Sequence, residues 1–129
     1  MIVHENKEWY EVPEYDYLYA NRDGEILSTN YRRGRFSIPK IKILKQNEDW
    51  NHYLYVWIID RPVSVHKLIT LTFFGKKPEG MEIDHIDGNR QNNRIENLRY
   101  VSHKMNINNS ITRNRRSEAL KGKKYKRAV

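Results

Sequence analysis

Apolar residues in the first half of the chain recur in short runs between turn-forming residues, a pattern typical of β-strands. In YLYANRDGEILS, at 17–28, such residues flank the turn at 21–24, whose Asp-Gly pair supplies the backbone freedom of a tight turn. IKIL at 41–44 and YLYVWII at 53–59 predict two more strands, and the second should be the most buried segment. We expect the chain to turn after it at 60–62.

The pattern then changes to a helical period in VSVHKLITLTFFG, at 63–75. Ser64 can cap this helix and Gly75 can end it. Its apolar face has the 3–4 spacing of a helix and comprises Val65, Leu68, Ile69 and Thr72.

A strand-loop-strand unit follows, with short strands expected around 81–86 and 98–101. The long loop between them is rich in asparagine, whose side chain competes for nearby backbone groups and disfavours both helix and strand. So much asparagine indicates a tightly hydrogen-bonded loop, a ligand site, or both. Beyond the second strand, Ser102 can cap a helix that begins at His103.

Composition narrows the class of protein. A chain of 129 residues fits one domain with at most a small appendage, and its 38% hydrophobic and 31% charged residues indicate a modest core. The absence of cysteine excludes disulfides and cysteine-ligated zinc and fits a reducing compartment. No apolar run approaches the roughly 18 residues that span a bilayer, and the start resembles no targeting signal. We therefore expect a soluble intracellular protein without a membrane partner.

The net charge of +8 is unevenly distributed along the chain. Residues 1–30 carry 2 Lys/Arg against 7 Asp/Glu, a net of −5, and residues 31–99 carry 13 against 8, a net of +5. Residues 100–129 carry 9 against 1, a net of +8. A basic last third is typical of a polyanion binder, although a solvated tail that aids solubility would look the same.

Asp84 and His85 stand side by side at the end of the first strand of this unit. A histidine with a pKa of about 6.5 can activate water for phosphodiester hydrolysis, and a hard divalent cation on oxygen ligands can stabilise the phosphoryl charge. Asn106, in the first turn of the expected helix, offers an amide oxygen opposite the carboxylate. Because adjacent strand residues point to opposite faces, Asp84 and His85 can serve one phosphate only if the strand ends or bends there.

Residues 81–109 resemble the HNH nucleases, also called the ββα-metal or His-Me finger group, and in particular the homing endonucleases of phages and introns. The shared pattern is an acidic residue or His before His-x-Asp-Gly-Asn, then Asn-Asn, Asn-Leu, and a final Asn or His on a helix. The residues in this pattern are Asp84, His85, Asp87, Gly88, Asn89, Asn92, Asn93, Asn97, Leu98 and Asn106.

The resemblance implies roles for four of these residues. His85 would be the general base, and Asp84 and Asn106 would hold one divalent ion, Mg²⁺ or Mn²⁺. Asn97 would serve catalysis by fastening the loop that holds the histidine strand, and the other loop residues would mainly shape it. No structural zinc is expected, because relatives that hold one use cysteines.

Upstream segments extend the resemblance. VHKLITLTFFG resembles the V-H-[RK]-L helix that precedes the nuclease motif, and residues 9–28 resemble a small N-terminal module of the NUMOD4 type. The implied fold is α+β. It comprises a small N-terminal antiparallel β-sheet module that contacts DNA at 1–62, a ββα-metal nuclease core at 63–110 and a basic C-terminal tail at 111–129.

The implied partner is double-stranded DNA, in the cytoplasm of a phage-infected bacterial host. A monomer would nick one strand, whereas a homodimer could cut both. The tail should attract phosphate without sequence preference, a salt-sensitive effect. The candidate DNA contacts are Arg32, Arg33, Arg35, Arg90, Asn92, Arg94, Arg113, Arg115, Arg116, Lys121, Lys123 and Lys124.

Other interpretations compete with these assignments. The whole domain could be a DNA-binding module with weak or no catalysis, or its basic surface could bind RNA or a protein. His66 lies in the helical pattern and is expected to pack behind the site rather than to act in catalysis. Tyr53, Tyr55 and Trp57 alternate along the expected strand and are most simply core and sheet-face residues.

Overall fold

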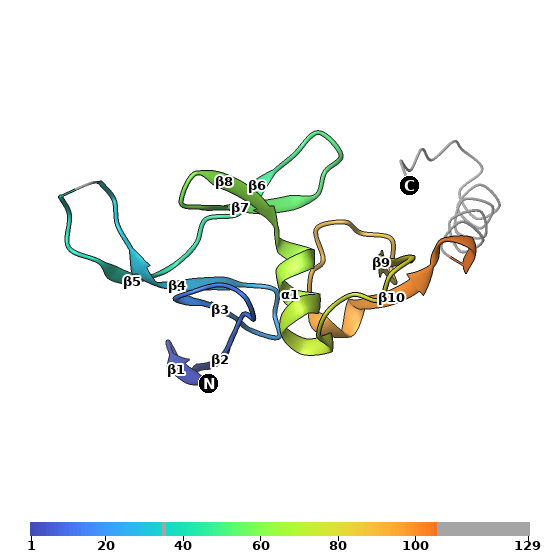
Figure 1. Cartoon of the computed structure of the whole chain (residues 1–129), viewed down its shortest axis with the longest axis horizontal. Coiled ribbons are helices and arrows are strands. Elements are labelled where there is room, and N and C mark those ends of the chain that lie inside the picture. Colours follow the sequence, from blue (N-terminus) through green and yellow to red (C-terminus); the bar gives the residue numbers. More distant parts are fainter. Residues whose placement is uncertain (35, 106–129) are drawn as a thin grey trace.

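The computed structural model describes residues 1–34 and 36–105, in which small antiparallel sheets surround one helix (Figure 1). A five-stranded sheet has the order β1-β2-β3-β4-β5. Its strands are β1 (Ile2–His4), β2 (Lys7–Glu11), β3 (Leu18–Ala20), β4 (Ile26–Tyr31) and β5 (Lys40–Ile43). The predicted turn at 21–24 does join β3 to β4.

A three-stranded sheet follows in the chain, formed by β6 (Asn47–Glu48), β7 (Leu54–Ile58) and β8 (Arg61–Ser64). The prediction that 53–59 is the most buried segment is wrong, because only Val56 of β7 is buried and Trp57 is 54% exposed. One face of this sheet packs on the core while the other is open. The turn after β7 lies at 59–60, earlier than expected, since Ile58 already pairs with Arg61.

Helix α1 (Val65–Phe74) begins directly after Ser64 and ends at Gly75, as predicted. Gly75 has a φ of 83°, a conformation that favours glycine, whereas the Ser64 side chain makes no capping hydrogen bond. The buried residues of the helix are Val65, Leu68, Ile69 and Thr70. The buried threonine is Thr70 and not the expected Thr72. The Thr72 hydroxyl donates to the Leu68 carbonyl at 2.7 Å.

Strands β9 (Met81–His85) and β10 (Leu98–Ser102) pair antiparallel, and the short helix η1 (Ile95–Asn97) leads into the second of them. Residues 103–105 are helical, and the backbone N–H of Met105 donates to the Ser102 hydroxyl at 3.2 Å. The predicted cap at Ser102 is therefore confirmed. Asn106, Arg35 and the tail at 111–129 lie outside the described residues.

The core joins segments that are distant in the sequence. Helix α1 packs against strands of all three sheets, and one apolar cluster contains Leu18 and Ile26 from the first sheet, Val56 from the second, and Leu98 from the last. The expected α+β class is confirmed, whereas the domain boundaries at 62 and 110 stay predictions. No helix among the described residues is long and apolar enough to cross a membrane.

Candidate active site

Asp84 and His85 are the last two residues of β9 and lie opposite Arg99 and Leu98 of β10. Both side chains are buried, with exposed fractions of 3% and 6%. The strand ends at His85, whose carbonyl accepts a hydrogen bond from the Gly88 N–H at 2.7 Å. Both residues are still paired with β10, so the convergence of their side chains on one phosphate stays a prediction.

The His85 imidazole is held on several sides. Its Nε2 lies 2.8 Å from Oδ1 of the buried Asn93, and its ring packs against the rings of His66 and Tyr53, with centroids 5.4 Å and 5.9 Å away. With an amide oxygen facing Nε2, the hydrogen sits on that nitrogen and Nδ1 keeps its lone pair. The ring is therefore presented as a neutral base.

Burial lowers the pKa of His85, and the hydrogen bond to Asn93 and the charge of Asp84 only partly offset that effect. The neutral imidazole is thus the dominant form at pH 7. His66 is also neutral there, because burial, with help from the nearby His85, lowers the pKa of its imidazole to about 4. Its Nδ1 is buried and has no hydrogen-bond partner among the described residues.

The Asp84 carboxylate accepts a hydrogen bond from Arg99 Nε at 3.0 Å, across the strand pair. A carboxylate oxygen is a ligand that Mg²⁺ and Mn²⁺ favour, and Mg²⁺ usually keeps several waters on few protein ligands. Within 1–34 and 36–105 no group of three His, Cys, Asp or Glu side chains could hold an ion. The Asp84 carboxylate is a donor of the kind that such a cation takes, and Asn106, the second expected ligand, lies outside the described residues.

The asparagine-rich loop is closed by Asn97, which is 8% exposed. Its Oδ1 accepts from the Asp87 N–H at 3.0 Å, and its Nδ2 donates to Asp87 Oδ1 at 3.0 Å and to the Asn92 carbonyl at 2.9 Å. Burial would raise the pKa of Asp87, but hydrogen bonds from Asn92, Asn89 and Asn97 outweigh it and lower the pKa. These bonds are those expected of a residue that fastens the loop.

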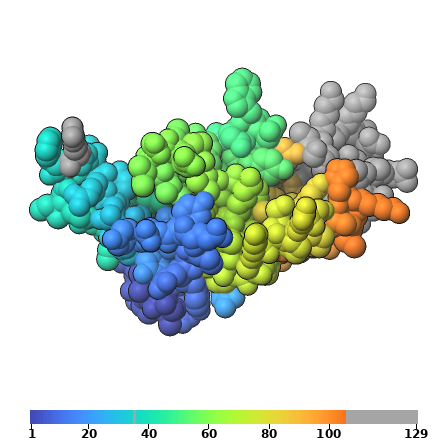
Figure 2. Space-filling model, in the orientation of Figure 1, coloured from blue at the N-terminus to red at the C-terminus, as the bar shows by residue number. Residues whose placement is uncertain are grey.

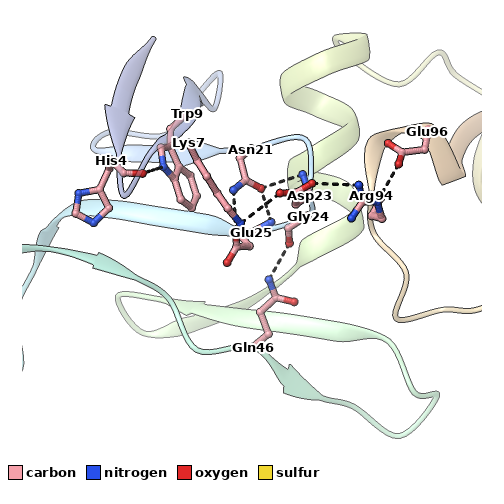
Figure 3. A network of polar contacts seen from close by, with 10 residues as sticks. All are labelled: His4, Lys7, Trp9, Asn21, Asp23, Gly24, Glu25, Gln46, Arg94 and Glu96. Carbon is pink, nitrogen blue, oxygen red and sulfur yellow. Dashed lines mark hydrogen bonds and ion pairs between the residues drawn. The ribbon is translucent and has the colours of Figure 1, made fainter.

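The turn at 21–24 supports the same loop from the N-terminal sheet (Figure 3). The Ile95 N–H donates to the Arg22 carbonyl at 3.0 Å, and Arg94 pairs with Asp23 at 3.3 Å. Gly24, with a φ of 89°, lies so close that a Cβ there would stand 2.8 Å from the Asn93 carbonyl oxygen. Nothing in the sequence indicated this contact.

The β6–β7 turn contacts the loop from another side. Arg90 donates from Nη1 to the Asn51 carbonyl at 2.7 Å, and its guanidinium lies 4.8 Å from the centroid of the Tyr53 ring. Sequence reasoning treated Tyr53 as a sheet residue and Asn93 as a loop-shaping residue. Both contact His85 directly. The sequence pointed only to Asn93, because that residue belongs to the Asn-Asn pair of the motif.

The predicted DNA contacts that lie among the described residues fall into two groups. Arg90, Asn92 and Arg94 lie on the loop that follows His85, although Arg94 is engaged by Glu96 and Asp23. Arg32 and Arg33 are exposed on the β4–β5 hairpin, at the opposite end of the molecule (Figure 1). The other predicted contacts are outside the described residues: Arg35, Arg113, Arg115, Arg116, Lys121, Lys123 and Lys124.

An Asp-His pair at the end of a strand, a hydrogen-bonded loop, a return strand and the start of a helix define the HNH class of nuclease site. Residues 63–107 match the family described as HNH endonuclease, which confirms the resemblance for this part of the chain. The family is generally dependent on a divalent metal. The resemblance of residues 9–28 to a NUMOD4 module stays a prediction.

Two relatives and one solved structure extend the likeness. The chain is 30% identical over 111 residues to DNA endonuclease I-HmuI of Bacillus phage SP01, covering 82% of this chain and 59% of that protein. It is 31% identical over 90 residues to uncharacterized HNH endonuclease L245 of Acanthamoeba polyphaga mimivirus, covering 67% of this chain and 24% of the relative.

The solved structure concerns DNA binding and cleavage by the HNH homing endonuclease I-HmuI. Its chain and this chain superpose with a TM-score of 0.67 and are 29% identical in sequence. The match covers 82% of this chain and 59% of that one. The fold of I-HmuI and the fold of this chain therefore agree beyond the nuclease motif, since the match extends well outside 63–107.

Proposed function

We propose that this chain is a DNA endonuclease of the HNH homing type that hydrolyses phosphodiester bonds with the help of one divalent metal ion, Mg²⁺ or Mn²⁺. The observation that carries the proposal is a buried, neutral His85 whose Nε2 is occupied by Asn93, next to the buried carboxylate of Asp84. The names of I-HmuI and its structure support DNA as the substrate.

His85 Nδ1 would take a proton from a water molecule, and that oxygen would attack the phosphorus in line with the bond to the 3′ oxygen. The bond between phosphorus and the 3′ oxygen breaks, and the leaving oxygen takes up a proton from water, which leaves a 5′-phosphate and a 3′-hydroxyl. Asp84 and Asn106 would hold the divalent ion, which when bound stabilises negative charge on the phosphate and on the leaving oxygen. Arg90 would contact the phosphate backbone beside the site.

A supercoiled-plasmid assay with Mg²⁺, Mn²⁺ or EDTA tests this function on wild type, His85→Ala and His4→Ala. We expect wild type and His4→Ala, which changes a histidine on β1 outside the site, to relax or linearise the plasmid only with metal. His85→Ala should lose on the order of 10² to 10⁴ in rate, the usual contribution of a general base. A His85→Ala protein that cuts as fast as wild type would defeat the assignment.

The products bear on two further points. Nicked circles would support a monomer and linear plasmid a homodimer, because residues 1–34 and 36–105 contain one such site. If wild type and His85→Ala both bind DNA but neither cuts it, the alternative of a DNA-binding module on the HNH fold is favoured. The phage relative supports the cytoplasm of an infected bacterium as the place of action.

A further inference from the structure

The turn between β6 and β7 stands out from the surface of the molecule (Figure 2). Asp49 closes this turn: its Oδ1 accepts from the N–H groups of Asn51 at 2.8 Å and Tyr53 at 3.0 Å, and its own N–H donates to the Tyr53 carbonyl at 2.9 Å. Trp50 is at the tip and is 95% exposed. A turn with this many internal bonds holds its tip in a defined place.

The turn is also attached to the asparagine-rich loop that follows His85. Arg90 binds the carbonyl of Asn51, the residue next to Trp50, and stacks on Tyr53, whose ring packs against His85. On the other side of the turn, hydrogen bonds from His52 and Gln91 lower the pKa of Glu48. The position of Trp50 is therefore tied to that of His85 through Arg90 and Tyr53.

The surroundings of Trp50 suit bases rather than phosphates. A groove of about 630 Å³ opens beside it, with Tyr55 and Trp57 among its walls. The carboxylates of Glu48 and Asp49 border the same groove and would repel phosphate. Aromatic faces stack on bases of any sequence, and apolar side chains inserted at base steps are common in proteins that bend DNA.

We propose that Trp50 stacks on a nucleobase of the DNA beside the scissile phosphate, so that the β6–β7 turn is a second contact with the substrate. The inference rests on the proposed function, since it takes DNA as the ligand. The other two tryptophans are differently placed: Trp9 is fully buried, and Trp57 packs edge-on against Tyr55 with ring centroids 5.9 Å apart.

Binding of a short mixed-sequence duplex in EDTA tests the inference by tryptophan fluorescence. With Trp57→Phe as the background, Trp50 is the one exposed tryptophan left, because Trp9 is buried. Stacking on bases should quench its emission on addition of duplex, and Trp50→Phe in that background should abolish the response. Unchanged emission at saturating duplex would overturn the inference.

Affinity and cleavage give the second readout. Trp50→Ala should weaken duplex binding roughly tenfold, within the range for loss of one base–aromatic stack, whereas Trp50→Phe should retain most of the affinity. Ile59→Ala is the matched control, because Ile59 is equally exposed at the turn on the other end of β7. If wild type neither binds nor cuts DNA, the proposed function fails; if wild type does both and Trp50→Ala equals it, only the role of Trp50 fails.

Discussion

The hydrogen bond between Asn93 and His85 makes a sharp test of how the site prepares its base. Asn93 is 3% exposed, and its Oδ1 forms a hydrogen bond with His85 Nε2 at 2.8 Å. In Asn93→Ala the rings of His66 and Tyr53 still enclose the imidazole, but the preference for hydrogen on Nε2 is lost. A hydrogen bond of this kind contributes roughly 1.5 kcal/mol, and because it favours the imidazolium that forms when His85 takes a proton, its loss corresponds to about tenfold in rate.

We therefore expect the cleavage rate of Asn93→Ala to fall about tenfold or somewhat more, with duplex binding nearly unchanged. Asn93→Asp should behave differently, because a carboxylate at this place stabilises the imidazolium and raises the pKa of His85. In wild type, burial keeps that pKa below its usual range. The raised pKa would protonate the base at a higher pH, so the acid limb of the rate profile should move upward and the rate approach wild type only in alkaline buffer.

The assay is single-turnover plasmid cleavage at saturating metal across a range of pH, with circular dichroism to show that each variant is folded. Asn89→Ala is the matched control, since it removes an asparagine from the same loop whose Oδ1 accepts from the Gln91 N–H at 3.0 Å and does not contact His85. An Asn93→Ala rate equal to that of wild type would refute the reasoning. So would an acid limb that stays in place in Asn93→Asp.

Two further predictions concern the supports of the site. Gly24→Ala should lower stability by about 1–3 kcal/mol and slow cleavage, because its Cβ would press on Asn93 from a backbone that favours glycine. Gly34→Ala, whose Cβ meets nothing within 4 Å, should stay near wild type in the same urea and cleavage assays, and equal effects would contradict the contact. The unfolding free energy should fall as the pH drops from about 6.5 towards 4, because His66 stays neutral in the folded protein while the unfolded chain takes up a proton there. With the pKa of the folded-state His66 lowered to about 4, the loss of stability at pH 5 is about 2 kcal/mol. Urea titrations at pH 8 and pH 5 should show a smaller loss for His66→Phe than for wild type, and an equal loss would exclude His66 as the cause.

Much of the fold was readable from local patterns. The turn at 21–24, helix α1 between Ser64 and Gly75, and the strands around the asparagine loop each depend on residues close together in the chain. Asp84, His85 and Asn97 could be singled out for the same reason, because the spacing of one short motif carries them. Local propensity and spacing act over a few residues, so a sequence expresses them directly.

The tertiary structure alone decided which surfaces these elements bury and which residues meet at His85. The apolar run of β7 does not tell which of its faces will be covered, and one face was left open. Tyr53 reaches His85 because β7 packs beside α1, and Gly24 reaches Asn93 because the first sheet packs beside the loop. Such contacts join residues far apart in sequence, and no periodicity of a single chain records them, because they arise only when the elements share one core.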